Sequence, residues 1–179
     1  MVNDREFVAA LLACGAVQFG SFTLASGKTS DYYVDIKRAL TRPELLREIA
    51  RRMAPHVRGY DRIAAVELGA VPIAAAVALE SSVPFVMVRK EAKEHGTRQP
   101  FEGEMRPGDR VVFVEDVVTT GGTLRAAVER MRASGAVVDR AVAVVDREEG
   151  GTATLVAAGI ALVSLLTARD LRTVRPISK

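Results

Sequence analysis

Between residues 111 and 123, four apolar residues lead directly into an acidic pair, Glu115 and Asp116, and then into a turn rich in threonine and glycine. The apolar residues have the length and β-branched content of a strand that is buried on both faces. After the turn, apolar residues recur at helical spacing from residue 124 to residue 131. Glycines between a strand and a helix let backbone amides point outward, where the helix dipole favours an anion. The segment therefore predicts a strand–turn–helix unit that binds a phosphate.

The acidic pair restricts the kind of phosphate compound that fits this turn. Two carboxylates repel a phosphate unless they face another part of the ligand, such as sugar hydroxyls, or a bridging metal. A ribose 5-phosphate meets both requirements. The chain contains neither the Gly-x-x-x-x-Gly-Lys-Ser/Thr pattern of a Walker loop nor the Gly-x-Gly-x-x-Gly pattern of a dinucleotide-binding turn. The alternative is an ordinary strand–helix unit whose strand ends in acidic residues.

Length and composition agree with a compact enzyme of the cytoplasm. The 179 residues are 49% hydrophobic, which is enough to bury a full core as one domain. The first residues are charged and no long apolar run follows them, so we expect neither a signal peptide nor a membrane span. Cys14 is the only cysteine, which excludes an intrachain disulfide. The formal net charge of +3 requires no nucleic-acid partner and would help to attract small anions.

Apolar patterns divide the chain into alternating helices and strands without a linker or an internal repeat. Helices are expected at residues 4–14, 43–56, 71–80, 122–134 and 151–158, a hairpin at 22–35, and strands at 62–67, 84–89, 110–115, 137–145 and 160–166. This alternation predicts an α/β fold with a central parallel sheet, flanked by helices, that binds ligands at the carboxyl ends of its strands. We expect residues 1–179 to form a single domain, with a small N-terminal hood at about residues 1–40 and a core at about residues 41–179.

A second group of charged residues begins at Arg89 and opens a segment without predicted secondary structure that extends to about Gly108. Long loops inside compact domains are usually functional or disordered. The cations and the imidazole of this segment would suit a lid that closes over a diphosphate and stabilises charge on a departing pyrophosphate. The alternative is a solvated, charge-balanced surface loop.

Four separate matches, in the same order along the chain, identify a family. They are residues 22–28 with 31–33, residues 89–96, residues 111–123 and residues 146–150. With them the chain resembles the orotate phosphoribosyltransferases along nearly its whole length. The resemblance implies the type I phosphoribosyltransferase fold and a transferase that moves the ribosyl 5-phosphate group of phosphoribosyl diphosphate (PRPP) to N1 of orotate. The products would be orotidine 5′-monophosphate and pyrophosphate, in pyrimidine biosynthesis.

The resemblance also implies roles for individual residues. Arg89, Lys93 and His95 would belong to a catalytic lid with the pattern Arg-Lys-x-x-Lys-x-His, and Asp116 would complete the catalytic set. PRPP would be bound by Arg89, Lys90, Lys93, His95, Glu115, Asp116, Val117, Val118, Thr119, Thr120, Gly121, Gly122 and Thr123. Thr119 and Arg147 would contact orotate. The family forms homodimers in which the lid of one chain reaches the active site of the other, so the expected partners are PRPP, orotate and a second copy of the chain, with no nucleic acid and no membrane.

Arg147 has a chemical reason for its role. Orotate carries a carboxylate on C6, and a guanidinium offers two parallel donors to such a group, whereas uracil has no carboxylate. The alternative for Arg147 is a surface ion pair with Glu148 or Glu149. Mg²⁺ is the expected cofactor, bound mainly through the phosphates of PRPP rather than by a protein cage, which leaves Glu115 and Asp116 for the ribose hydroxyls.

Two positions depart from the family pattern. Ala25 stands where several bacterial relatives carry a lysine, and Lys28 is the nearest substitute. Leu68 and Gly69 lie where some members have a lysine in a pyrophosphate-binding loop, so backbone amides are expected to bind there instead. Two other functions stay open, a purine-type phosphoribosyltransferase and a PRPP-sensing regulator that is not an enzyme. The regulator would need a DNA-binding domain, for which the roughly twenty residues before the hairpin leave no room.

Overall fold

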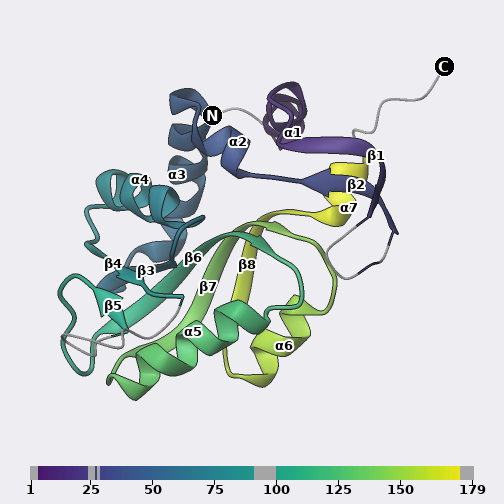
Figure 1. Cartoon of the computed structure of the whole chain (residues 1–179). Helices are drawn as coiled ribbons and strands as arrows, with labels where there is room; N and C mark the ends of the chain where they lie inside the picture. The colour runs from purple at the N-terminus through teal and green to yellow at the C-terminus, as the bar shows by residue number, and fades with distance from the viewer. Residues whose placement is uncertain (1–3, 24–26, 28, 91–99, 174–179) are drawn as a thin grey trace.

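The computed structural model describes residues 4–23, 27, 29–90 and 100–173, and strands and helices alternate along most of the chain (Figure 1). The strands are β1 (Val17–Thr23), β2 (Thr29–Val34), β3 (Arg62–Val66), β4 (Phe85–Val88), β5 (Phe101–Glu102), β6 (Arg110–Val118), β7 (Val137–Asp146) and β8 (Ala161–Thr167). The helices are α1 (Asp4–Ala13), α2 (Lys37–Leu40), α3 (Pro43–Val57), α4 (Val71–Ser81), α5 (Gly122–Ala133), α6 (Gly151–Ala157) and α7 (Ala168–Thr173).

Six strands form the central sheet in the order β5-β4-β3-β6-β7-β8, and β1 pairs with β2 in a separate antiparallel hairpin. Neighbours from β4 to β8 run parallel, while β5 runs antiparallel to β4. The predicted fold class, a central parallel sheet flanked by helices, is therefore confirmed. The β1–β2 hairpin stands apart from the sheet and lies beside α7, which follows β8 (Figure 1). The hairpin lies within the segment predicted as the N-terminal hood, and from here on the word hood refers to this hairpin alone.

Helices cover both faces of the central sheet, and each face has its own apolar core. Strand β6 contributes to both, because Val112 and Val114 pack on the side of α3 and α4 while Val111 and Phe113 pack on the side of α5. All four side chains are fully buried. This confirms the prediction of a strand buried on both faces, which fixes the position of the residues that follow it.

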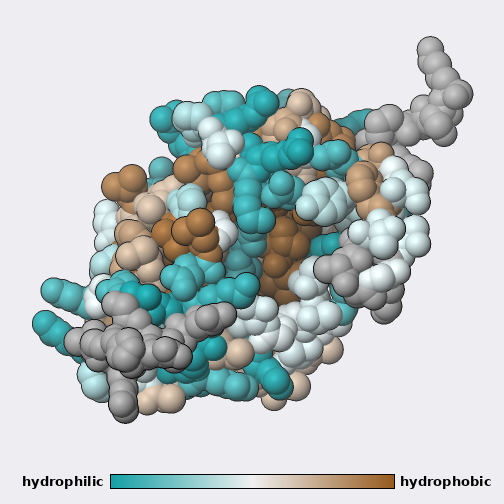
Figure 2. Space-filling view, viewed as in Figure 1, coloured by the Kyte–Doolittle hydropathy of each residue, from teal (hydrophilic) through white to brown (hydrophobic). Residues whose placement is uncertain are grey.

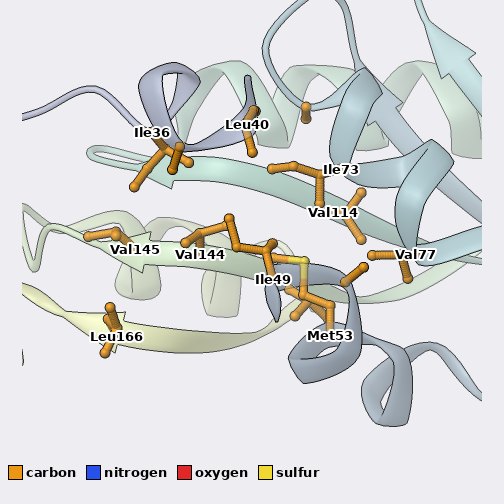
Figure 3. Close-up of a cluster of buried hydrophobic side chains, with 14 of the residues drawn as sticks. Ile36, Leu40, Ile49, Met53, Ile73, Val77, Val114, Val144, Val145 and Leu166 are labelled. Atoms are coloured by element: carbon orange, nitrogen blue, oxygen red, sulfur yellow. The ribbon is translucent and has the colours of Figure 1, made fainter. Parts of the chain in front are cut away.

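Helix α3 illustrates how sequence pattern produces the first of these cores. It begins at Pro43, whose fixed φ suits the first helical turn. Its buried residues Ile49, Met53 and Val57 recur every four positions, so they share one face. Figure 3 shows Ile49 and Met53 pointing into the same buried cluster as Ile73 of α4. The core on this side thus holds α4 firmly against the sheet.

Three expectations from the sequence are wrong, and all concern strands. The hairpin begins at Val17 rather than at residue 22, because Val17 already pairs with Val34. The segment expected to lack secondary structure up to Gly108 contains β5, in which buried Phe101 pairs with Val88. A strand of two residues is too short to show a periodic pattern. Strand β6 runs to Val118 rather than to residue 115, because its last residues still pair with β7. The acidic pair therefore lies within the strand and not after it.

The order of the strands predicts a crevice at the carboxyl ends of the two central strands, β3 and β6. From β3 the chain passes through α4 to β4 on one side, whereas β6 lies on the other side of β3 and leads through α5 to β7. At such a reversal the loops after the two strands diverge, and ligands of α/β proteins bind in the resulting crevice. The loops after β3 and β6 are therefore the first place to look for a site.

Within the described ranges no helix is long and apolar enough to cross a membrane. The cytoplasmic location stays a prediction.

Candidate active site

The turn between β6 and α5 encloses a small cavity of about 70 Å³, lined by residue 115 and residues 117–124. Gly121 caps α5 with a φ of +77°, a conformation that glycine adopts without strain. The first helical hydrogen bond runs from Arg125 N to Gly121 O at 2.9 Å. The N–H groups of the preceding residues have no acceptor inside the helix, and the positive end of the helix dipole lies there. The turn can therefore bind an anion such as a phosphate.

The acidic pair is organised by its own backbone. Asp116 N donates to Glu115 Oε1 at 3.1 Å, and Val117 N donates to Asp116 Oδ1 at 2.8 Å. Burial and the adjacent Asp116 carboxylate raise the pKa of Glu115 well above its usual range, so its neutral form is favoured. The two carboxyl groups thus have different surroundings, and Asp116, which lies against Gly69, is the better candidate to accept hydrogen bonds from hydroxyl groups.

The loop between β3 and α4 completes the wall opposite the acidic pair. A Cβ atom built on Gly69 would lie 3.0 Å from Asp116 Oδ2, so a larger residue would push the carboxylate away by a few tenths of an ångström. Leu68 beside it is 83% exposed, so this loop lies at the surface. On its other side Glu67 Oε1 accepts a hydrogen bond from Lys90 N at 2.9 Å. The loop therefore connects the acidic pair to the start of the predicted lid.

Only the first two of the predicted lid residues are described. The guanidinium of Arg89 forms an ion pair with Glu102 of β5. The backbone carbonyl of Arg89 accepts a hydrogen bond of 3.0 Å from Arg130 Nη2 on α5. The side chain of Lys90 is exposed. Lys93 and His95 lie outside the described residues, as do Ala25 and Lys28. Arg89 and Lys90 are thus placed beside the crevice, and the roles of all four predicted lid residues stay predictions.

Arg147 lies next to the phosphate turn, as the sequence predicts for two parts of one site. Its backbone N donates to Val118 O at 2.9 Å. Its guanidinium carbon lies 5.1 Å from the centre of the Tyr32 ring in the hood, and its Nη2 lies 2.7 Å from Glu149 Oε1. The side chain is only 9% exposed. The arrangement brings a buried cation, the hood and the phosphate turn, which includes Thr119, together.

Several residues that organise this region were not identified from the sequence. Asp146 is 7% exposed and accepts hydrogen bonds of 2.8 Å from Glu148 N and from Thr152 Oγ1, which shapes the loop that carries Arg147. The guanidinium carbon of Arg172 in α7 also lies near Tyr32, 5.0 Å from the centre of its ring. The sequence gives no signal for Arg172, because its contact depends on the folding of the two ends of the chain onto each other.

Gly151 was missed as well, although a Gly-Gly pair after residues 146–149 was a visible signal. A Cβ atom at this position would lie 2.5 Å from Val118 Cγ1 and 2.6 Å from the carbonyl oxygen of Thr119. The start of α6 therefore packs directly against the backbone of the phosphate turn, which no larger residue permits. Gly151 holds the Arg147 loop and the phosphate turn in register.

Replacing Gly151 with alanine is expected to lower the free energy of unfolding by about 1–3 kcal/mol, the usual effect of overpacking, and to weaken phosphate binding. Denaturant unfolding of the purified variant measures the first effect. Gly122→Ala is the matched control, because a Cβ there would meet nothing closer than Thr120 Oγ1 at 4.0 Å. Equal stability of Gly151→Ala and wild type would show that the turn and α6 are not packed as described.

The comparisons with known proteins agree with this geometry. The family model described as phosphoribosyl transferase domain matches residues 35–154. The chain is 52% identical over 171 residues to an orotate phosphoribosyltransferase of Methanosarcina acetivorans, covering 94% of this chain and 91% of the relative. Among solved structures, Leishmania donovani UMP synthase is 37% identical with a TM-score of 0.86, covering 98% of this chain and 40% of that one. Orotate phosphoribosyltransferase from Aeropyrum pernix is 35% identical with a TM-score of 0.83, and the match covers 93% of this chain and 96% of that one.

Proposed function

The chain belongs to the orotate phosphoribosyltransferase family, and from this premise we propose how the residues of its site divide the work of the reaction. The enzyme transfers the ribosyl 5-phosphate group of PRPP to orotate and releases pyrophosphate, a step of pyrimidine biosynthesis. One observation carries the assignment of the site. The hydrogen bond from Arg147 N to Val118 O joins a phosphate-binding turn to a buried cation suited to a carboxylate.

The phosphate turn and the acidic pair bind the ribose phosphate. The amides at the start of α5, with the hydroxyls of Thr119, Thr120 and Thr123, surround the 5-phosphate. Asp116, which lies against Gly69, accepts hydrogen bonds from the ribose hydroxyls, with Glu115 beside it as a carboxyl group whose pKa is raised by burial. Backbone amides around the exposed Leu68 bind the diphosphate in place of a lysine. PRPP thereby spans the crevice from α5 to α4.

Orotate is placed by Arg147 and Thr119. The guanidinium of Arg147 donates to the C6 carboxylate, which turns N1 of the ring toward the anomeric carbon of PRPP. The ring of Tyr32 supports the guanidinium from the hood at 5.1 Å. A base without a carboxylate leaves this buried cation without its ligand, which opposes the binding of uracil.

Catalysis depends on positioning and on stabilising the leaving group. As the bond from the anomeric carbon to the diphosphate breaks, the ribose gains oxocarbenium character and the pyrophosphate gains charge. Arg89, Lys90, Lys93 and His95 of the lid stabilise that charge, with Lys93 and His95 supplied by the second copy of a homodimer. The reaction needs no covalent enzyme nucleophile, because N1 of orotate attacks the ribose directly.

The family points to a metal-dependent reaction of PRPP, and we propose Mg²⁺ as the metal. No group of three or more His, Cys, Asp or Glu residues that could hold a metal occurs in the part of the chain that the structure describes. The residues present fit an ion bound mainly through the substrate, because Mg²⁺ retains much of its water and prefers phosphate oxygens. It would neutralise charge on the diphosphate, while Glu115 and Asp116 remain available to the ribose hydroxyls.

The surface of α4 supports the proposed homodimer. Figure 2 shows apolar side chains gathered over α4, where Leu79 is 88% exposed, and two apolar hollows of about 400 Å³ and 210 Å³ lie at the two ends of the helix. A helix that is apolar on its solvent face normally has a partner. The second hollow is lined by Lys37 and by Leu68 and Gly69 of the crevice, so a partner on α4 reaches the site.

Replacing Leu79 with glutamate is expected to convert the dimer to monomers at concentrations where the wild-type protein is dimeric, because it buries a charge in an apolar interface. Analytical ultracentrifugation measures the mass. Val156→Glu is the matched control, since Val156 is 61% exposed on α6, outside the α4 surface. A Leu79→Glu variant that stays dimeric would remove α4 from the interface.

The substrate assignment has a direct test. The purified protein is incubated with PRPP, Mg²⁺ and, separately, orotate, uracil, adenine and hypoxanthine, and pyrophosphate release is followed. Of the four bases, we expect only orotate to cause the release of pyrophosphate. Comparable or faster turnover of adenine or hypoxanthine would favour the purine-type activity instead, and binding of PRPP without turnover of any base would favour a sensor.

A further inference from the structure

Arg147 is already engaged by a carboxylate of its own chain. We propose that Glu149 is an internal competitor of the substrate carboxylate, which orotate must displace from Arg147 in order to bind. Glu149 would then set the affinity of the site for its carboxylated base and its selectivity against weaker anions. The inference rests on the proposed function, because it takes Arg147 as the residue that binds orotate.

The contact between Glu149 and Arg147 uses only one of the two parallel N–H donors on one edge of the guanidinium. Nη2 of Arg147 lies 2.7 Å from Glu149 Oε1. Nε is buried and has no hydrogen-bond partner among the residues that the structure describes. In a guanidinium, Nε and Nη2 lie along one edge with their N–H bonds parallel, so this edge can bind both oxygens of one carboxylate. Glu149 therefore contacts the Nη2 donor and leaves the Nε donor without an acceptor.

The two partners differ in their freedom to move. Arg147 is 9% exposed, lies against the Tyr32 ring and is anchored through its backbone to Val118. Glu149 is 38% exposed, so its carboxylate can turn into water, where it is fully hydrated. A ligand carboxylate that binds the Nε–Nη2 edge with both oxygens also supplies the acceptor that the buried Nε lacks. The exchange thus replaces a one-atom ion-pair contact by two hydrogen bonds and releases Glu149 to solvent.

The other carboxylates of this loop have different partners. Glu148 accepts a hydrogen bond of 3.0 Å from Arg169 N and lies 3.7 Å from the Arg169 guanidinium. Asp146 accepts hydrogen bonds from Glu148 N and Thr152. Their contacts shape the loop and leave Glu149 to pair with Arg147. Glu148 is therefore a suitable control, as an acidic neighbour with the same charge and a different contact.

Competition of this kind has a definite sign. The apparent dissociation constant of a ligand rises in proportion as the competent form of its site is depopulated. If Glu149 occupies Arg147 for most of the time, removing its charge lowers the KM for orotate. If Glu149 instead only positions Arg147, removing it loosens the guanidinium and raises that KM. The two roles are separated by the direction of the change.

The experiment measures KM for orotate, KM for PRPP and kcat for wild type, Glu149→Gln, Glu149→Ala and the control Glu148→Gln, with Mg²⁺ present throughout. We expect both Glu149 variants to lower the KM for orotate by about threefold to tenfold, with the alanine variant at least as strong, because the competent fraction of the site increases. KM for PRPP and kcat should stay within about twofold of wild type, and Glu148→Gln should keep the wild-type KM for orotate. Direct titration of orotate into each variant provides a second readout that is independent of turnover.

The outcomes distinguish this inference from the function on which it rests. A wild-type enzyme that turns over orotate, together with an unchanged or higher KM for orotate in both Glu149 variants, would overturn the internal competitor and leave the function standing. A wild-type enzyme that ignores orotate would overturn the proposed function, and the inference with it. An equal decrease in KM for Glu148→Gln would assign the effect to the general charge of the loop and would also overturn a specific role of Glu149.

Discussion

Replacing Asp116 with asparagine should lower kcat/KM for PRPP by about 10²- to 10³-fold while leaving the protein folded, because hydrogen bonds to a charged acceptor contribute about 1.5–3 kcal/mol each. The carboxylate lies near the end of β6, two residues before the strand ends at Val118, accepts a hydrogen bond from Val117 N at 2.8 Å and lies beside Gly69. Asparagine keeps the shape and one acceptor but removes the charge that two ribose hydroxyls would share. Steady-state kinetics with PRPP varied, supported by a thermal unfolding curve, measure the effect.

Glu115→Gln is the matched control for this experiment. Since burial and the Asp116 charge raise the pKa of Glu115, its neutral form is favoured, and glutamine imitates that form. We therefore expect a loss of less than about tenfold for Glu115→Gln. Wild-type kcat/KM in a folded Asp116→Asn variant would make the ribose assignment wrong. Equal losses in the two variants would contradict the inequality of the two carboxyl groups.

The parts of the structure that could be predicted are those encoded by local pattern. Most helices and strands agree with their predicted bounds to within one residue, because their apolar residues repeat with the period of the element. The phosphate turn follows for the same reason, since strand, turn and helix are contiguous in residues 111–131. Strand β5 escaped prediction because pairing with β4, and not its own composition, makes Phe101 extended.

Contacts between distant segments could not be predicted from pattern. Nothing in the sequence places Gly69 within reach of Asp116, and this proximity arises from the pairing of β3 with β6. The support of Arg147 by Tyr32 depends on the folding of the hood toward the end of β7. The chemistry of orotate suggested Arg147, and a surface ion pair with Glu149 was the competing interpretation. The structure contains that ion pair, in a side chain too buried for an ordinary surface contact.

A second large effect is expected when two inactive variants are combined. Lys93→Ala should lack the lid cation that stabilises the leaving pyrophosphate, and Arg147→Ala should lack the group that binds orotate. If the lid of one copy serves the site of the other, mixing the two variants restores activity, because one site of each heterodimer receives both intact residues. Random exchange gives about half heterodimers with one good site each, so roughly a quarter of wild-type activity is expected.

The mixture of Asp116→Asn with Arg147→Ala is the matched control for complementation. Both residues lie on the same chain's side of the crevice, at the ends of β6 and β7, so each site of that heterodimer keeps one defect and activity should stay low. Adding Leu79→Glu to both members of the first pair should also abolish the recovery, because we propose that the two chains meet at the α4 surface. If subunit exchange is verified and the Lys93→Ala and Arg147→Ala pair gains nothing over its parents, the lid closes over its own chain. In that case the two active sites of the dimer would work independently.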